Sequence, residues 1–166
     1  QRAGRAICEM HFLLPLAGLD PGALADALLA DPGIAGDRRR RAWAQSVADW
    51  DFRRLRGYLQ GYIDLVVEHD GRWFVCDYKS NRLPAYDRAH CEDAMLASGY
   101  LLQGRLYQLA LHRHLRHCLD DYRAADHLGG MTYLFLRGLP DAGVWHEPAE
   151  AAGVAALDAL CAEGTI

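Results

Sequence analysis

Two aspartates and one lysine stand at spacings that suit metal-dependent chemistry. Lys79 is the only lysine among the 18 lysine and arginine residues of the chain, and it follows Asp77 by two positions in the segment FVCDYKSN. Asp70-Gly71, between Asp64 and Asp77, is a strong signal for a tight β-hairpin turn. A hairpin centred on that turn places Asp64 directly opposite Asp77, on one face of the two strands. Lys79, two residues beyond Asp77, projects from the same face.

Two carboxylates that face each other inside a sheet repel and resist ionisation. A shared proton, a salt bridge to Lys79 or a bound divalent cation would each relieve the repulsion. A plain Asp77–Lys79 ion pair is a common arrangement, yet a buried pair of this kind adds little net stability over apolar packing. A hard cation accounts for all three residues, because Mg²⁺ takes oxygen ligands. The carboxylates of Asp64 and Asp77 would supply them, together with the main-chain carbonyl of Tyr78.

A lysine has a property at this position that arginine lacks. Arginine stays charged, whereas the pKa of a lysine shifts readily on burial. Beside a metal ion, a group that orients or deprotonates a water molecule assists hydrolysis, which favours lysine at position 79. Chance retention of one lysine in an arginine-rich chain is the alternative that composition leaves open.

The other face of the same hairpin is apolar and is expected to belong to the core. Its residues are Ile63, Leu65, Val67, Phe74, Cys76 and Tyr78. Because Val66 and Val75 also flank the acidic pair, the hairpin is predicted to lie inside a sheet covered by helices.

The other elements alternate between strand and helix. Strands are predicted at 7–14 and 131–136, and Asp20-Pro21 opens a helix that stops near Pro32. A long helical segment follows at 93–122, and a last helix is compatible with the alanine-rich 148–162. The segment 37–59 reads as irregular or helical, and 81–92 reads as a loop. This alternation predicts an α/β domain.

The bulk numbers suit one domain, 1–166. A net charge of −4 argues against a protein coated in basic surface, so any nucleic-acid contact comes from a local patch. The arginines at 38–41 and at 53, 54 and 56 are either solvated helix faces or phosphate contacts. Five cysteines without a C-x-x-C pair favour free thiols in a reducing, cytoplasmic setting. Neither a membrane-spanning run nor a secretory signal is present.

Several segments together resemble one known family. GYIDLVVEHDGRWFVCDYKSNRL is similar to the metal-site hairpin of the PD-(D/E)XK nuclease superfamily, and most narrowly to the C-terminal nuclease domains of the RecB family (exodeoxyribonuclease V beta subunits). The segments EMHFLLPL, GYLQG, YLLQGRLYQLALHRHL and GGMTYLFLRG extend the resemblance, in family order, over about 7–146. The resemblance implies a restriction-endonuclease-like fold, a central mixed β-sheet flanked by helices, with 147–166 as a tail.

The resemblance also implies roles for individual residues. Asp64 and Asp77 would be ligands of Mg²⁺, for which Mn²⁺ is able to substitute. Tyr78 would add its main-chain carbonyl, and Lys79 would be the catalytic lysine. Gln103 and Tyr107 match a Q-x-x-x-Y element that lies beside the site and the DNA, and their spacing puts them on one helix face. Without the resemblance, helix packing would account for both.

One part of the family pattern is expected outside this sequence. The family's first helix, which carries a histidine ligand, would precede Gln1, so we expect a fragment of a longer helicase–nuclease chain. His11 lies inside the first predicted strand and is not assigned that role. Whether the fragment is active by itself is left open.

The implied activity is that of a Mg²⁺-dependent DNA exonuclease and endonuclease domain of a RecBCD-type helicase–nuclease. Such a domain hydrolyses phosphodiester bonds during double-strand break repair and recombination, with DNA and RecC-like and RecD-like subunits as partners. ATP would bind only in the helicase part, since no phosphate-binding G-x-x-x-x-G-K-[ST] loop occurs here. Two alternatives stay open: a Cas4-like nuclease, whose iron–sulfur cysteine grouping is lacking, and a non-catalytic DNA-binding or subunit-docking module.

Overall fold

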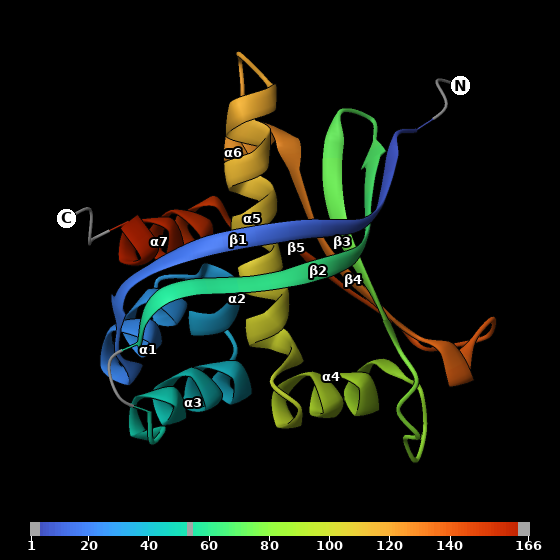
Figure 1. Cartoon of the computed structure of the whole chain (residues 1–166). Helices are drawn as coiled ribbons and strands as arrows, with labels where there is room; N and C mark the ends of the chain where they lie inside the picture. The colour runs from blue at the N-terminus through green and yellow to red at the C-terminus, as the bar shows by residue number, and fades with distance from the viewer. Residues whose placement is uncertain (1–3, 53–54, 163–166) are drawn as a thin grey trace. The chain divides into compact units, whose positions relative to one another are not determined.

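The computed structural model describes residues 4–52 and 55–162, and it contains a five-stranded sheet (Figure 1). The strands lie in the order β1-β2-β3-β4-β5, which is also their order along the chain. β2 pairs antiparallel with β3, β3 pairs parallel with β4, and β4 pairs antiparallel with β5. The predicted mixed sheet is therefore confirmed. The strands are β1 (Ala6–Leu19), β2 (Leu55–His69), β3 (Arg72–Lys79), β4 (Leu128–Phe135) and β5 (Val144–Pro148).

Helices occupy most of the remaining described chain. The crossover between the parallel strands β3 and β4 runs through three of them: α4 (Arg88–Ala97), α5 (Tyr100–Cys118) and α6 (Ala124–His127). Short 3₁₀ turns η1 and η2 lie at Val47–Asp49 and Leu136–Gly138. The other helices are α1 (Pro21–Leu29), α2 (Pro32–Ala35), α3 (Arg38–Ser46) and α7 (Ala151–Ala162).

By its internal contacts the chain divides into two compact units. The first comprises Gln1–His11 and Tyr62–Ala149, and the second comprises Phe12–Gly61 and Glu150–Ile166. The long strands β1 and β2 each contribute to both units. The acidic pair, Lys79 and α5 all belong to the first unit.

The β2–β3 hairpin has the turn and the register expected from the sequence. Asp70 (φ +49°) and Gly71 (φ +77°) both adopt the left-handed conformation that a two-residue hairpin turn requires. The facing pairs run from His69 and Arg72 at the turn to Leu65 and Cys76. The predicted register is thus confirmed over five consecutive pairs.

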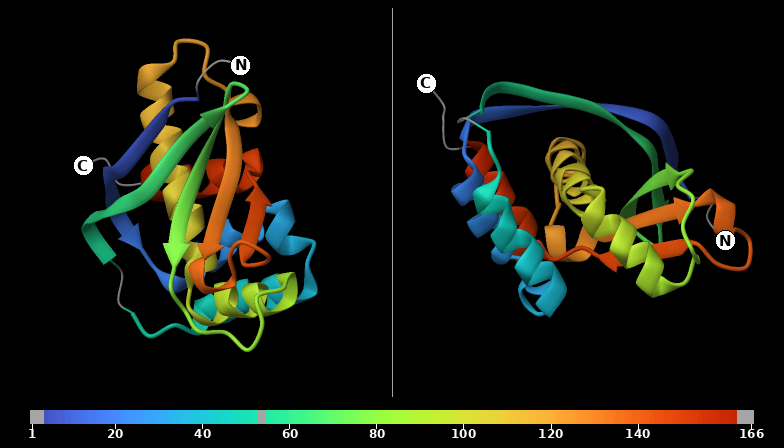
Figure 2. Two further views of the ribbon diagram at one scale, coloured as in Figure 1. Left: turned by 90° about the vertical axis from the view of Figure 1, so that its right-hand side faces the viewer. Right: turned by 90° about the horizontal axis from the view of Figure 1, so that it is seen from below.

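Helix α5 covers one face of β3 and β4 in the first unit (Figure 2). Gly104 makes the close approach possible, since a Cβ at that position would collide with Met131 Sδ and would come within 3.2 Å of the Tyr133 ring. Met131 and Tyr133 stand beside Val75 and Asp77 in the sheet, so they share their face. The helix-covered face is therefore the one that carries Asp77.

The opposite face is less buried than expected. Ile63 and Cys76 are buried there, but Tyr78 is 43 % exposed and was wrongly predicted to be in the core. Apolar alternation alone does not say which face a helix covers, and the crossover helix α5 lies on the side of Asp77.

The second unit contains a small helical core. Helix α1 packs against α3 and α7, and the buried residues of α7 are Val154, Leu157 and Cys161. Arg40 and Arg41 donate hydrogen bonds to the carbonyl oxygens of Gly33 and Ala35. Part of the first arginine run thus holds α2 to α3, while Arg53 and Arg54 of the second run lie outside the described residues.

Some element boundaries differ from the prediction. Strand β2 begins at Leu55, inside the segment interpreted as irregular or helical, and strand β5 was not predicted at all. The long helical segment is two helices, because Gly99 (φ +70°) turns the chain between α4 and α5. Among the described residues, none of the helices is both long and apolar enough to cross a membrane.

Candidate active site

The two aspartates stand next to each other at the end of the hairpin pairing. The last facing pair is Leu65 and Cys76, and the next position on each strand is Asp64 and Asp77. The main-chain N–H of Tyr78 donates a 3.0 Å hydrogen bond to Asp64 Oδ2. The Asp64 carboxylate is thereby held against the β3 backbone, one residue from Asp77.

Lys79 closes the group with three kinds of contact. Its Nζ lies 2.6 Å from Asp77 Oδ2 and donates a 2.9 Å hydrogen bond to Gln103 Oε1. It also lies 4.1 Å from the centre of the Tyr100 ring, a cation–π distance. The ion pair that the sequence offered as an alternative is therefore present, and the side chain of Lys79 remains 12 % exposed.

Gln103 connects the lysine to the tyrosines of the site. Its Nε2 donates a 3.0 Å hydrogen bond to the Tyr107 hydroxyl, so the two residues share one face of α5 as predicted. The Tyr133 hydroxyl donates to the Tyr100 carbonyl at 3.0 Å and also lies 3.2 Å from Gln103 Oε1. The amide of Gln103 is thus oriented from both sides.

Burial dominates the electrostatics of Asp77, which is 3 % exposed. Desolvation raises the pKa of its carboxyl above the ordinary value, and the negative charge of Asp64 adds to the effect. The contact with Lys79 lowers the pKa but does not offset burial. A buried carboxylate with a raised pKa beside a second carboxylate is a typical functional-site arrangement.

The tyrosines around Gln103 remain protonated at neutral pH. Burial raises the pKa of Tyr107 to about 12, with further contributions from the charges of Asp77 and Asp64. Burial also raises the pKa of Tyr133, and the charge of Asp77 adds to the effect. Both hydroxyls are therefore hydrogen-bond donors and not bases.

The donor set suits a small hard cation. Asp77 Oδ2 is buried beside the Asp64 carboxylate, and among the described residues its contact is the Lys79 ammonium at 2.6 Å, an ion pair without hydrogen-bond geometry. Within 4–52 and 55–162, no three His, Cys, Asp or Glu side chains cluster closely enough to hold a metal ion. Two carboxylates, with a main-chain oxygen such as that of Tyr78, are a typical partial set for Mg²⁺, which keeps several waters or phosphate oxygens.

Tyr100 and Tyr133 are the site residues that the sequence did not single out. Their rings lie 6.0 Å apart, nearly parallel, beside Lys79 Nζ. Tyr100 precedes Gln103 by three residues, a same-face spacing on a helix that would have found it. Tyr133 reaches the site only through the parallel pairing of β3 with β4, which no local pattern predicts.

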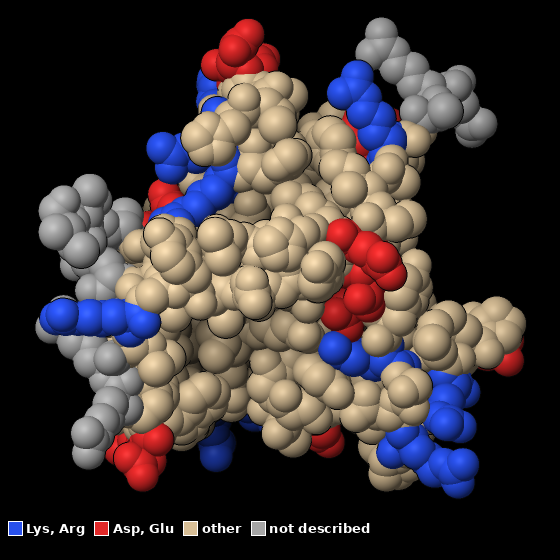
Figure 3. Space-filling view, in the orientation of Figure 1, with Lys and Arg blue, Asp and Glu red and all other residues tan. Residues whose placement is uncertain are grey.

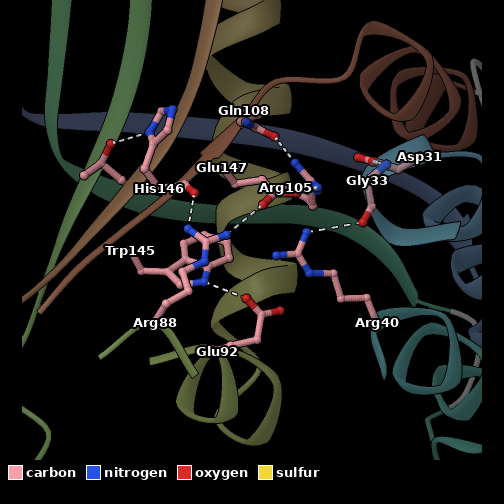
Figure 4. Close-up of polar contacts among 11 residues, drawn as sticks. Asp31, Gly33, Arg40, Arg88, Glu92, Arg105, Gln108, Trp145, His146 and Glu147 are labelled. Atoms are coloured by element: carbon pink, nitrogen blue, oxygen red, sulfur yellow. Dashed lines mark hydrogen bonds and ion pairs between the residues drawn. The ribbon is translucent and has the colours of Figure 1, made fainter. Parts of the chain in front are cut away.

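A buried polar network fixes the other side of α5 (Figure 4). Arg105 is 1 % exposed, with its Nη2 3.4 Å from Glu147 Oε1 in β5 and its Nη1 donating to Gln108 Oε1 at 3.1 Å. Trp145 Nε1 donates a 2.7 Å hydrogen bond to Glu92 Oε2 in α4. Helices α4 and α5 are thus both tied to β5 by polar contacts.

Acidic and basic side chains form separate groups on the face of the molecule that Figure 3 shows. Figure 3 shows acidic side chains gathered over β1 and β2, beside β3, with basic side chains next to them over the end of β3 and the loop that follows. Arg137, whose Nε donates to the Ser80 carbonyl at 2.8 Å, borders that loop. Acidic side chains that attract a cation thus lie next to basic side chains that attract phosphate.

Comparison with known proteins decides the family. The family model described as the PD-(D/E)XK nuclease superfamily matches residues 23–163. The chain belongs to the PD-(D/E)XK nuclease superfamily. The match spans β2, β3 and α5, the elements that position the acidic pair, Lys79 and Gln103.

Relatives within this nuclease superfamily are RecB subunits. The chain is 38 % identical over 168 residues to the RecBCD enzyme subunit RecB of Escherichia coli (strain K12), covering 95 % of the chain and 13 % of the relative. It is 42 % identical over 145 residues to RecB of Mycobacterium tuberculosis, covering 79 % of the chain and 13 % of the relative. RecB of Mycolicibacterium smegmatis is 36 % identical over 154 residues, covering 82 % and 14 %. The chain thus spans a small part of the relatives' length, and the similarity supports a nuclease of RecB type.

Proposed function

We propose that this PD-(D/E)XK chain is a Mg²⁺-dependent deoxyribonuclease that hydrolyses phosphodiester bonds, with exonuclease and endonuclease activity of the exodeoxyribonuclease V type. One observation carries the proposal: the buried Asp77 carboxylate stands beside Asp64 and in contact with the ammonium of Lys79. Packing alone would not favour two acids at this place in a sheet.

Asp64 and Asp77 would hold the cation, with the main-chain carbonyl of Tyr78 as a further ligand. Mn²⁺ would take the same oxygens. When bound, the cation supplies a positive charge that acidifies water and offsets negative charge on the phosphate. The high pKa of Asp77 has a consequence here: a cation must compete with a proton for its carboxylate, so binding weakens as the pH falls.

Lys79 would act on the attacking water and on the phosphate. Its ammonium is placed by Asp77 and Gln103, which leaves its remaining N–H donor capacity for a substrate oxygen. The proximity of Tyr100 and Tyr133 confines it to one position. A fixed donor aimed at developing negative charge contributes to the rate without reorganising during the reaction.

Gln103 and Tyr107 would support the site and line the path of the DNA. Gln103 Oε1 accepts a hydrogen bond from Lys79 Nζ, and Gln103 Nε2 donates a hydrogen bond to the Tyr107 hydroxyl. Burial raises the pKa of Tyr107 to about 12, so its hydroxyl keeps its proton at neutral pH.

The relatives' name suggests the setting in which the chain works. We infer a role in a RecBCD-type helicase–nuclease with RecC-like and RecD-like subunits, acting on DNA in double-strand break repair and recombination. ATP would be used by a helicase part elsewhere in such an assembly. The cysteines are present as thiols and not as disulfides, which is compatible with the reducing cytoplasm; they are Cys8, Cys76, Cys91, Cys118 and Cys161.

Cleavage of end-labelled linear DNA tests the proposal. Wild type is expected to cut in Mg²⁺ and to stop in EDTA, and Asp77→Ala and Lys79→Met are expected to lose at least about a hundredfold in rate. Asp121→Ala, which removes an exposed acid from the same unit, is the matched control and should cut like wild type. Equal cleavage by wild type and Asp77→Ala would remove the catalytic assignment.

A second candidate is a non-catalytic DNA-binding or docking module. The observation that favours it is the short Asp77–Lys79 ion pair, which satisfies both charges without a cation. Calorimetric titration separates the two: heat of Mg²⁺ binding that Asp77→Asn abolishes supports the nuclease, and the absence of heat with DNA present supports the module.

A further inference from the structure

Tyr62 is a large aromatic side chain that remains exposed close to the acidic pair. It is 61 % exposed and precedes Asp64 by two residues in β2, so both side chains project from the same face of the strand. Two residues of a strand span about 7 Å, which is about the rise of two stacked nucleotides. Ile63 between them points the other way and is fully buried.

His11 supports the Tyr62 ring from the neighbouring strand. His11 lies in β1 and Tyr62 in β2, which are neighbouring strands of the sheet. The two ring centres are 5.0 Å apart with an angle of 51° between the planes. One side of the tyrosine is therefore backed by the imidazole, and the rest of its surface faces solvent.

We propose that Tyr62, backed by His11, is a stacking platform for an unpaired base of the DNA strand whose phosphate reaches Asp64 and Asp77. The inference rests on the proposed nuclease function and adds a positioning residue to it. Only an unstacked base has a free ring face, so the platform selects single-stranded or frayed DNA. Aromatic side chains bind single strands in this way without regard to sequence.

Because the net charge of the protein is negative, the bound strand needs a source of binding energy other than long-range attraction for phosphate. The chain carries −4 overall, and acidic side chains gather on the face that bears β1 and β2, so long-range attraction for phosphate is weak (Figure 3). Base stacking does not depend on the charge of the protein. It would hold the strand in register while the acidic pair with its cation engages a single phosphate.

Anisotropy of labelled oligonucleotides in Mg²⁺ tests the platform, with Lys79→Met as the background so that bound DNA is not cut. Two oligonucleotides of equal length are compared, one of thymidines and one with abasic sites throughout. Tyr62→Ala is expected to weaken binding of the thymidine strand about tenfold and to leave binding of the abasic strand unchanged. Tyr62→Phe, which keeps the ring and removes the hydroxyl, should bind like tyrosine.

Val144→Ala is the matched control, since Val144 is an exposed apolar residue of β5 on the opposite face of the sheet. It should bind both strands like the background protein, and thermal melting of each variant checks the fold. Two results would overturn the platform: the background protein binds thymidine and abasic strands equally, or Tyr62→Ala weakens binding of both strands equally. Tyr62 would then be only a packing partner of His11. The cleavage assay with Asp77→Ala tests the nuclease function separately, so the two failures are distinguishable.

Discussion

Lys79 shows at the residue scale why this position is selective for its side chain. Its ammonium fits between a carboxylate at 2.6 Å, an amide oxygen at 2.9 Å and an aromatic ring centre at 4.1 Å. A guanidinium is wider, planar and permanently charged, and it would have to displace Gln103 or Tyr100 to fit.

Lys79→Arg therefore keeps the charge but is expected to lose at least about a hundredfold in cleavage rate. Single-turnover cleavage of end-labelled DNA measures the loss. The reciprocal change on the surface, Arg116→Lys at the exposed end of α5, should leave the rate near that of wild type. An arginine variant that cuts as fast as wild type would show that charge alone is needed at this position.

Asp77 links the chemistry to stability through its pKa. Burial raises the pKa of the Asp77 carboxyl above 3.8 in the folded protein. The folded state therefore holds this proton more tightly than the unfolded state does. The stability gained from a protonated Asp77 is present at low pH and is lost as the pH rises through the folded pKa.

The melting temperature of Asp77→Asn, which cannot ionise, should therefore rise relative to that of wild type as the pH increases from about 4 to about 8 in EDTA. Differential scanning fluorimetry across this range measures both proteins. Asp121→Asn, which removes an acid at an exposed position, is the control for a general effect of lost negative charge. An advantage that grows as the pH falls would contradict the raised pKa.

The sequence predicted the site residues that a local hairpin brings together. Asp64, Asp77 and Lys79 are related by strand alternation and one tight turn, so their common face followed from spacing. Tyr133 and the exposure of Tyr78 depend on where β4 and α5 come to lie, which is a tertiary property. Local patterns carry no information about either.

At the scale of elements, the position of α5 depends on buried charge. Arg105 is almost fully enclosed, and its partner Glu147 also lies 3.6 Å from Arg88. Removal of one member of a buried ion pair leaves the other charge without compensation, whereas replacement of both by apolar groups is often neutral.

Glu147→Ala is expected to lower the free energy of unfolding by about 3–5 kcal/mol. The double change Arg105→Met with Glu147→Leu should recover most of that loss, as measured by urea denaturation. A double variant as unstable as the single one would show that the network holds α5 by shape and not by charge balance.

The element pattern was predictable where periodicity and turn residues agree. Asp20 caps α1 as expected, by accepting a hydrogen bond from Ala23 N. Strand β5 escaped prediction because it is five residues long and its sequence, VWHEP, does not alternate polar with apolar residues, although its burial does. The first part of β2, read as irregular or helical, belongs to a strand only through its pairing in the sheet.

At the scale of the molecule, all proposed ligands belong to one of the two compact units. A cation that binds there should stabilise that unit more than the other, because ligand binding protects the segments that open together with the site.

Hydrogen exchange should therefore slow on addition of Mg²⁺ in β2 from Tyr62 onward, in β3 and in α5. Exchange in α1 and α7 of the other unit should change little. Asp77→Asn should remove the protection, which controls for general salt effects. Uniform slowing over both units would contradict a single cation site in the hairpin.

The most direct measurement is the anomalous scattering of Mn²⁺ in crystals of the protein. The proposed site predicts one strong peak within about 2.0–2.6 Å of carboxylate oxygens of both Asp64 and Asp77. Saturating Mn²⁺ without a peak between these two carboxylates, or a peak that only one of them reaches, would contradict a shared cation and the nuclease chemistry built on it.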